Sequence, residues 1–370
     1  MNFTSLDATE KGNRLTGKAP CGLISRHHRE VPVKAIVIRE FGPPGVMKLE
    51  EVPTPEPGAG EVLIKVHAVS VNRTLDTKVR AGTYARPVTL PLVPGVDPSG
   101  VIVKLGEGVT HRKIGDRVTV ALRLGNRNSG ADALRLLGVH AWGGYAEYVR
   151  AIAENTTIVP DNVDFPVATV VTRHAPMAFH MLQDHAKVEP GEWVLVMGAA
   201  GGLGSAGVQV AKYLGAKVIA AAGSDERVKV GLDLGADAGV NYRTHDLTVE
   251  AARITEGQGV NVVFENIGDP TTFPKAFAAM ARRGRLVTAG GHGGGVVPLD
   301  VNKLYLNQIT IMGRTGETET GAQESLRMAS EGKFKALIDC VLPLSEAVRA
   351  HEIVESRGGI GKVVLEPTRL

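Results

Sequence analysis

The fold is decided by the stretch Trp193-Val-Leu-Val-Met-Gly198-Ala-Ala-Gly201-Gly202-Leu-Gly204-Ser-Ala-Gly-Val-Gln-Val-Ala-Lys212. An apolar strand runs into a glycine-rich turn and then into an amphipathic helix. Glycines let such a turn close tightly and bring backbone N–H groups against a pyrophosphate, while the helix N-terminus supplies positive potential. A glycine triplet by itself describes an ordinary strand-to-helix turn equally well. The segment is therefore a dinucleotide site only if its surroundings agree.

The sequence that follows the turn supports a dinucleotide site. A second apolar strand follows at Lys217–Ala221, at the spacing of a β-α-β unit. The cofactor-binding residues expected at the turn are Gly198, Ala200, Gly201, Gly202, Leu203 and Gly204. We therefore predict nucleotide binding.

Strands and helices alternate after Pro160, which predicts a doubly wound parallel α/β sheet of the Rossmann type. The expected strands are Trp193–Met197, Lys217–Ala221, Asn261–Phe264, Arg285–Ala289 and, last, Gln308–Gly313. The expected helices span 203–214, 225–234, 246–256 and 271–282.

Before Pro160, short β-branched runs broken by Gly and Pro predict an antiparallel, strand-rich domain. These runs are Val33–Arg39, Glu61–Val71, Gly100–Lys104, Arg117–Ala121 and Ala146–Val149. Residues 1–32 show no such period and are expected to form a flexible arm, since their acidic residues argue against an organelle-targeting peptide. The predicted domains are thus 33–159 and 160–314, with 315–370 returning to the first through a strand at Lys362–Leu365.

Composition excludes several classes of protein. The chain has 370 residues, 43% of them hydrophobic, and a net charge of only +3 with both signs interspersed, which disfavours a nucleic-acid binder. No apolar run reaches the roughly 18 residues that a membrane span needs. Cys21 and Cys340 are the two cysteines, too few for a disulfide framework, so we expect a soluble cytoplasmic protein.

The end of the second strand bears on the choice between NADP(H) and NAD(H). A carboxylate there binds the ribose 2′-hydroxyl of NAD, whereas a 2′-phosphate needs room and a cation. Here the strand ends in Gly223-Ser224, and Arg227 follows. Asp225 and Glu226 are the counter-evidence, because either could serve a hydroxyl. We predict NADPH, with Ser224 and Arg227 in its site.

A catalytic or structural zinc is not expected. Two cysteines cannot supply the four thiolates of a structural zinc site, and the eleven histidines are dispersed without nearby thiolates. No Gly-x-Ser-x-Gly motif supports a serine hydrolase.

Six ordered motifs together carry a family resemblance. They are the segments 65–72, 76–84, 92–100, 115–118, 143–148 and 198–204. In these the chain resembles the medium-chain dehydrogenase/reductase superfamily, and most of all its zinc-free quinone oxidoreductase, or zeta-crystallin-like, branch. The resemblance covers about residues 33–367. It implies a GroES-like catalytic domain, a Rossmann domain, NADPH, and a homodimer or homotetramer joined through Gln308–Gly313.

The resemblance also implies the chemistry. A hydride would pass to a quinone or to the β-carbon of an enone, and hydrogen-bond donors would stabilise the oxygen on which charge develops. The loop Asn72–Tyr84 would face the nicotinamide, and Asn72, Lys78 and Tyr84 are the candidate donors, with Tyr84 or water supplying a proton. Tyr242, Asn266 and Gly290 would line the cofactor. Each candidate donor also has an ordinary structural interpretation, as a turn, surface or packing residue.

The sequence departs from the branch at three places. Lys78 stands where relatives show a tyrosine, and the spacing from Asn72 to Asp76 is one residue longer. Thr172-Arg173-His174 replaces the usual Thr-Ala, so Arg173 and His174 could meet an anionic substrate or a cofactor phosphate, or could be structural loop residues. Residues 123–137 lengthen a loop that could be a substrate lid or a remnant lobe.

Three alternatives stay open at this stage. An enoyl-thioester reductase would need a basic groove, which Lys78, Arg123, Arg127 and Arg173 could form. A zinc-free alcohol dehydrogenase-like enzyme shares the layout. A non-catalytic NADPH-binding protein is the alternative from a different class.

Overall fold

The computed structural model describes residues 32–125, 135–356 and 359–369. The predicted N-terminal arm, Arg127 and the middle of the 123–137 loop lie outside the described residues. Pro32–Leu370 forms one compact unit. Within the described part, no helix is both long and apolar enough to cross a bilayer.

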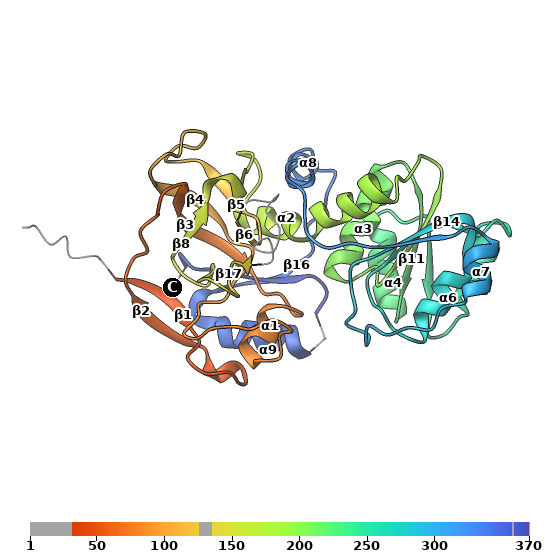
Figure 1. The fold of residues 1–370 in the computed structure, drawn as a ribbon, viewed down its shortest axis with the longest axis horizontal. Helices are drawn as coiled ribbons and strands as arrows, with labels where there is room; N and C mark the ends of the chain where they lie inside the picture. Colours follow the sequence, from red (N-terminus) through yellow and green to blue (C-terminus); the bar gives the residue numbers. More distant parts are fainter. Residues whose placement is uncertain (1–31, 126–134, 357–358, 370) are drawn as a thin grey trace, which may run out of the picture. The chain divides into compact units, whose positions relative to one another are not determined.

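The first part of the chain is built on a seven-stranded sheet in the order β16-β17-β3-β4-β5-β9, with β8 also paired to β3 (Figure 1). Its strands are β3 (Glu61–Ser70), β4 (Ser99–Leu105), β5 (Arg117–Val120), β8 (Tyr148–Ile152), β9 (Thr156–Ile158), β16 (Ile338–Pro343) and β17 (Lys362–Glu366). The last two strands come from the C-terminal segment, and β17 pairs antiparallel with β3 through Leu365 and Val69.

Smaller elements complete this part. They are β1 (Val33–Val37), β2 (Lys48–Val52), β6 (Arg123–Leu124), β7 (Arg135–Leu136), the short 3-10 turns η1 (Pro44–Val46), η3 (Ala153–Asn155) and η5 (Leu344–Glu346), and the helices α1 (Asp76–Ala81) and α9 (Ala347–Ser356). Alternating apolar side chains of β1, β3 and β4 fill the core below the sheet, including Ile36, Ile64 and Ile102.

Helix α1 corrects one expectation, because the segment Asn72–Tyr84 is not simply a loop. The carboxylate of Asp76 accepts the N–H of Asn72 at 2.7 Å and so fixes the chain as the helix begins. Gly82, at φ +73°, ends the helix in the left-handed conformation that glycine allows.

The second part is a six-stranded parallel sheet in the order β12-β11-β10-β13-β14-β15. Its strands are β10 (Trp193–Met197), β11 (Lys217–Ala222), β12 (Ala238–Asn241), β13 (Val260–Glu265), β14 (Met280–Thr288) and β15 (Thr310–Gly313). The expected combination of a doubly wound parallel sheet with a strand-rich GroES-like domain is confirmed.

Helices cover both faces of this sheet. They are α2 (Phe165–Phe179) with its π-helical extension η4 (His180–His185), α3 (Gly202–Tyr213), α4 (Asp225–Asp233), α5 (Leu247–Ile254), α6 (Thr272–Ala278), α7 (Val301–Leu306) and α8 (Glu319–Ser330). Val194 and Val196 of β10 pack on the side of α2 and α3, whereas Leu195 and Met197 pack on the side of α5 and α6. Burial on both faces explains why these strands are uninterrupted apolar runs.

Several predicted boundaries were wrong, and two of them have a clear physical reason. The helix expected over 271–282 ends at Ala278, and β14 begins at Met280, which pairs with Val260 of β13. The alanine-rich sequence favours a helix, but pairing with the buried strand β13 makes the segment from Met280 a strand. The last strand begins at Thr310 rather than at Gln308, whose φ of +55° places it in a turn.

Candidate functional site

The glycine turn between β10 and α3 has the form that a bound phosphate requires. Gly198 has φ +62°, and a β-carbon on Gly204 would lie only 2.1 Å from the carbonyl oxygen of Gly198. No side chain caps the N-terminus of α3 at Gly201, so its first N–H groups remain available for an anion. The predicted turn residues are thus brought together, and the cradle fits a dinucleotide.

The end of β13 lies against this turn. Asn266 donates from Nδ2 to the carbonyl oxygen of Met197 at 2.6 Å, and a β-carbon on Gly290 would lie 2.0 Å from the Asn266 carbonyl oxygen. Glu265 accepts the N–H groups of Ile267 and Gly268 at 2.8 and 2.9 Å. These contacts hold the ends of β10, β13 and β14 in one surface beside the cradle.

The end of β11 is surrounded by cationic and phenolic groups. A β-carbon on Gly223 would lie 3.2 Å from Tyr242 Oη and 3.3 Å from Arg243 Nε. Burial raises the pKa of Tyr242, and the charges of Arg243 and Arg227 oppose that rise, so both guanidinium groups lie near the phenol. The sequence pattern did not predict Arg243 as a site residue.

Of the two acids that could serve a ribose hydroxyl, Asp225 and Glu226, the first is engaged elsewhere through one oxygen. Asp225 Oδ1 accepts from Asn241 Nδ2 at 2.8 Å. Ser224 caps α4 by accepting the N–H of Arg227 at 3.4 Å.

The sequence does contain a signal for Arg243, because this residue directly follows Tyr242 after β12. Only the pairing of β11 with β12, however, brings Arg243 to Gly223.

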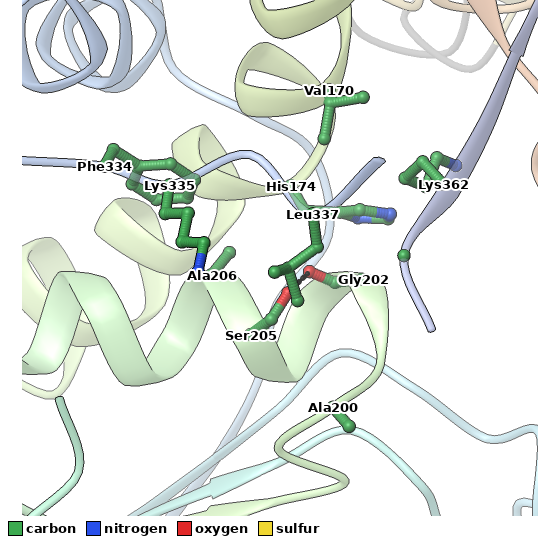
Figure 2. Close-up of a pocket in the computed structure, with 11 residues that line it drawn as sticks. Val170, His174, Ala200, Gly202, Ser205, Ala206, Phe334, Lys335, Leu337 and Lys362 are labelled. Carbon is green, nitrogen blue, oxygen red and sulfur yellow. Dashed lines mark hydrogen bonds between the residues drawn. The ribbon is translucent and has the colours of Figure 1, made fainter. Parts of the chain in front are cut away.

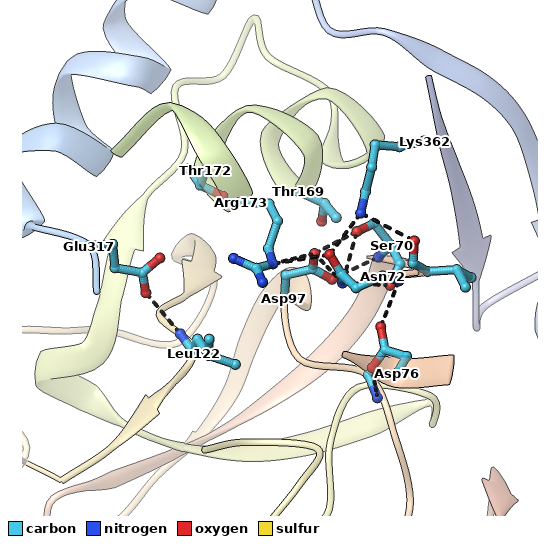
Figure 3. Close-up of polar contacts among 12 residues, drawn as sticks. Ser70, Asn72, Asp76, Asp97, Leu122, Thr169, Thr172, Arg173, Glu317 and Lys362 are labelled. Atoms are coloured by element: carbon cyan, nitrogen blue, oxygen red, sulfur yellow. Dashed lines mark hydrogen bonds and ion pairs between the residues drawn. The ribbon is translucent and has the colours of Figure 1, made fainter. Parts of the chain in front are cut away.

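A second cluster, the Asn72 network, lies where β3, α2 and β17 meet (Figure 3). Its members are Ser70, Asn72, Asp76, Asp97, Arg173 and Lys362. Asn72 Oδ1 accepts from Lys362 Nζ at 2.8 Å and from Arg173 Nε at 3.1 Å. Asn72 Nδ2 donates to Asp97 Oδ2 at 3.0 Å and more weakly to Ser70 at 3.4 Å. All polar atoms of the Asn72 side chain are therefore used inside the network.

The network contains two buried acids, Asp76 and Asp97, and two bases, Lys362 and the partly exposed Arg173. Burial, reinforced by the charge of Asp97, raises the pKa of Asp76 to about 6. Burial lowers the pKa of Lys362 to about 8, against the pull of the Asp97 and Asp76 carboxylates. Asp97 is held by the N–H and hydroxyl of Ser70 at 2.9 and 2.5 Å. Opposite charges make this arrangement tolerable in a low dielectric.

Lys362 connects the network to the glycine turn. Together with His174, Ala200 and Gly202 it lines one small cavity (Figure 2). Burial and the charges of Arg173 and Lys362 hold the pKa of His174 well below its usual value, so its ring is neutral at pH 7. A β-carbon on Gly202 would lie 2.6 Å from His174 Nε2. The neutral His174 ring thus faces the N-terminus of α3, and Lys362 lines the same cavity.

Arg173 and His174 lie within α2, rather than in a loop. Helix α2 is held to the first sheet by a 2.6 Å hydrogen bond between Thr169 Oγ1 and Ser99 Oγ. The two residues therefore project from a fixed element.

The other predicted donors lie apart from the network. Lys78 is exposed on α1, and Tyr84 is half-buried and packs against the core of the first part. Among the described residues, no hydrogen bond or ion pair links either side chain to the Asn72 network. Their proposed roles stay predictions.

Asp76, Asp97 and Lys362 were missed as site residues. Each follows or precedes an apolar run, where a charged residue ordinarily marks a turn. Their convergence depends on β17 returning to pair with β3, which no local pattern reports.

Metal ligands do not gather here. Residues 32–125, 135–356 and 359–369 hold no group of three or more His, Cys, Asp and Glu side chains suited to a metal. Cys340 is half-buried on β16, where burial raises the pKa of its thiol. In the Asn72 network only the Asp76 and Asp97 carboxylates could act as zinc ligands, whereas the Lys362 ammonium and the Arg173 guanidinium beside them could not.

Comparison with known proteins places this geometry in a family. Residues 58–161 match the alcohol dehydrogenase GroES-like domain, and residues 202–331 match the zinc-binding dehydrogenase domain. A quinone oxidoreductase from Sus scrofa is 31% identical over 343 residues, which are 90% of this chain and 97% of that protein. The chain belongs to the medium-chain dehydrogenase/reductase superfamily.

Other members of this superfamily agree. An alcohol dehydrogenase of Geobacillus stearothermophilus is 33% identical, covering 90% of this chain and 99% of that protein. The crystal structure of AibC superposes with a TM-score of 0.87 at 31% identity, over 95% of this chain and 99% of the other. A mycobacterial protein solved with NADPH superposes with a TM-score of 0.75 at 32% identity, over 90% and 100%. This medium-chain dehydrogenase/reductase is therefore an oxidoreductase with a nicotinamide cofactor site.

The resemblance to quinone oxidoreductases expected from the six motifs is confirmed. The zinc that the name of the second matching domain implies would find only the Asp76 and Asp97 carboxylates around Asn72, fewer than the three protein ligands of a catalytic zinc site.

Proposed function

We propose that the protein is an NADPH-dependent reductase of quinones or α,β-unsaturated carbonyl compounds that works without a metal ion. The observation that carries this proposal is the position of Lys362, which belongs both to the cavity at the glycine turn and to the Asn72 network. A cofactor bound at the turn and a substrate bound at the network would therefore be neighbours.

The preference for NADPH is supported by the end of β11. Guanidinium groups form paired, charge-assisted hydrogen bonds with phosphate, and Arg227 and Arg243 both lie near Tyr242 there. One carboxylate oxygen of Asp225 is occupied by Asn241, which leaves Asp225 less available to a ribose hydroxyl. The mycobacterial relative solved with NADPH agrees with this assignment.

Different residues of the chain would bind the cofactor and the substrate. The N–H groups of the first turn of α3 and the Lys362 ammonium would bind the pyrophosphate, with neutral His174 beside them. When bound, the reduced nicotinamide supplies a hydride. The residues around Asn72 exclude bulk water and present positive charge to a substrate oxygen.

Absence of metal chemistry is part of the proposal. It is supported by the Arg173 and Lys362 cations, which stand beside only two carboxylates in the network, and by the lack of three convergent metal ligands among the described residues. A cytoplasmic location accords with a chain that has two cysteines.

We also propose that the protein self-associates along β15, which is an edge strand of the six-stranded sheet. Val301, Tyr305 and Leu306 of the adjacent α7 are 60, 61 and 64% exposed. An unpaired strand edge beside an apolar surface favours pairing with a second copy.

The proposal is tested by titrating the purified protein with NADPH and NADH, and by following oxidation of the preferred cofactor with a quinone, an enone and an enoyl thioester. We expect tight NADPH binding and turnover of a quinone or an enone. Preference for the enoyl thioester would favour the thioester reductase instead. NADPH binding without turnover would favour a non-catalytic binder.

A further inference from the structure

Arg173 is the cation of the Asn72 network that does not face the cofactor cradle. Its Nε donates to Asn72 Oδ1 at 3.1 Å and lies 3.8 Å from Asp97 Oδ2. Figure 3 shows Arg173 and Lys362 approaching Asn72 from different directions. Lys362 lines the cavity with Gly202, whereas Arg173 does not.

The contacts of Nε leave the two terminal nitrogens of the Arg173 guanidinium unused. Within the described part of the chain, neither terminal nitrogen of Arg173 has a hydrogen-bond acceptor, and neither is a buried atom without a partner. The side chain is 18% exposed. The two terminal nitrogens therefore face accessible space, while Nε, Asn72 and Asp97 fix their direction.

We infer that Arg173 binds the substrate oxygen on which negative charge develops, and so takes the role that a metal ion would otherwise have. The inference deepens the proposed function and rests on it for the identity of the substrate. A fixed guanidinium has two advantages over a mobile one, since its charge is always present and its donors need no reorganisation during the reaction.

The chemistry balances without a metal. The hydride forms a new C–H bond at the β-carbon of the enone. The electron pair of the C=C bond then forms a double bond between the α-carbon and the carbonyl carbon, and the π electron pair of the C=O bond moves onto oxygen. The nicotinamide is oxidised as the enone is reduced. Arg173 holds the resulting enolate oxygen through its terminal N–H groups without giving up a proton, and water protonates the α-carbon.

The surrounding charges suit this role. Asp97 and Asp76 offset Arg173 and Lys362, so the resting network is close to neutral and the guanidinium is not drawn permanently to one acid. Its 3.8 Å separation from Asp97 is longer than a direct hydrogen bond. Charge that appears on a substrate oxygen can therefore be met by Arg173.

The test compares Arg173→Gln, Arg173→Lys and Arg173→Ala with the control Arg349→Gln. Arg349 is 64% exposed and pairs only with Glu346 among the described residues. Arg173→Lys keeps a positive charge next to Asp97 and serves if the neutral variants fail to fold. The readouts are the NADPH dissociation constant, kcat with an enone, and binding of 4-nitrophenolate, an anionic mimic of the enolate oxygen, to the enzyme with NADP+.

We expect kcat to fall by about 10²–10³ in Arg173→Gln, the effect of removing one oxyanion donor. NADPH affinity should stay within about twofold of the wild type, because Arg173 lies away from the cradle, and phenolate binding should be lost. Added guanidinium should restore part of the rate of Arg173→Ala, and Arg173→Lys should recover it only weakly.

Two results would overturn the inference. One is weakened NADPH binding with unchanged kcat, which would make Arg173 a cofactor ligand. The other is a wild-type enzyme that does not bind the phenolate, or binds it equally well after the substitutions. If phenolate binding requires Arg173 but no acceptor oxidises NADPH, the reductase proposal fails while the oxygen-binding role of Arg173 stands.

Discussion

Lys362 donates a 2.8 Å hydrogen bond to Asn72 and thereby ties the last strand of the chain to the end of β3. The two residues are 290 positions apart in the sequence. Lys362 is also one of the residues that line the cavity at Gly202. One residue therefore connects the two parts of the molecule at the place where a cofactor and a substrate would meet.

The affinity for NADPH should depend on pH through Lys362. Its pKa is lowered to about 8, so the ammonium is present below that pH and is lost above it. Asp76, Asp97, Arg173 and His174 are the charged and titratable groups that face it. Because an anionic cofactor prefers the charged form, we expect the dissociation constant measured by fluorescence titration to rise between neutral and strongly alkaline pH.

The matched variants for this prediction are Lys362→Arg and Lys362→Met. The arginine keeps its charge throughout and should remove the alkaline weakening, whereas the methionine should bind NADPH weakly at every pH. An unchanged pH dependence in Lys362→Arg would assign the titration to another group.

The choice of NADPH over NADH should depend on Arg243 and Arg227. We expect Arg243→Ala to weaken NADPH binding about 10- to 100-fold, the range of one charge-assisted hydrogen bond, and to leave NADH binding unchanged. Arg253→Ala is the control, since Arg253 is 68% exposed on α5 and pairs with Glu250. An equal loss for both cofactors would mean that Arg243 supports the fold and does not read the 2′-phosphate.

The local sequence pattern was sufficient to predict the fold and the glycine turn that would bind the cofactor. The run from Trp193 to Lys212 joins a strand, a turn and a helix within the reach of neighbouring residues, so its periods and glycines report the structure directly. The same holds for β11, whose end at Ala222 is marked by Gly223 and Ser224.

Local pattern was insufficient for the Asn72 network. Asp97, Arg173 and Lys362 come from three separate segments, and each is an unremarkable charge in its own surroundings. Only the pairing of β17 with β3 and the packing of α2 through Thr169 bring them to Asn72. The helix error at Met280 has a similar cause, because β13 lies beside it in space and not in sequence.

Two glycines of the turn should respond differently to a methyl group. In Gly204→Ala the β-carbon would lie 2.1 Å from the Gly198 carbonyl oxygen, and the backbone would have to move. We expect the free energy of unfolding to fall by several kcal/mol at least and NADPH binding to be lost. In Gly201→Ala the nearest atom, the Gly198 carbonyl oxygen, would lie 3.2 Å away, a tight contact that a shift of a few tenths of an ångström relieves, so the variant should fold and lose much less stability.

NADPH binding separates the two roles of the turn. Gly201 caps the N-terminus of α3, where a phosphate would approach the backbone closely. Gly201→Ala should therefore weaken NADPH binding without unfolding the protein. Wild-type affinity in Gly201→Ala would argue that the phosphate does not contact this end of the helix.

Self-association along β15 should depend on the exposed apolar side chains of α7. We expect Tyr305→Glu combined with Leu306→Glu to shift the protein to a monomer, because two buried negative charges would meet their copies across a two-fold axis. Sedimentation velocity measures the change. The control Val249→Glu alters an apolar residue of similar exposure, 63%, on α5. If the wild type sediments as a monomer, or if the control dissociates it equally, the β15 edge is not the interface.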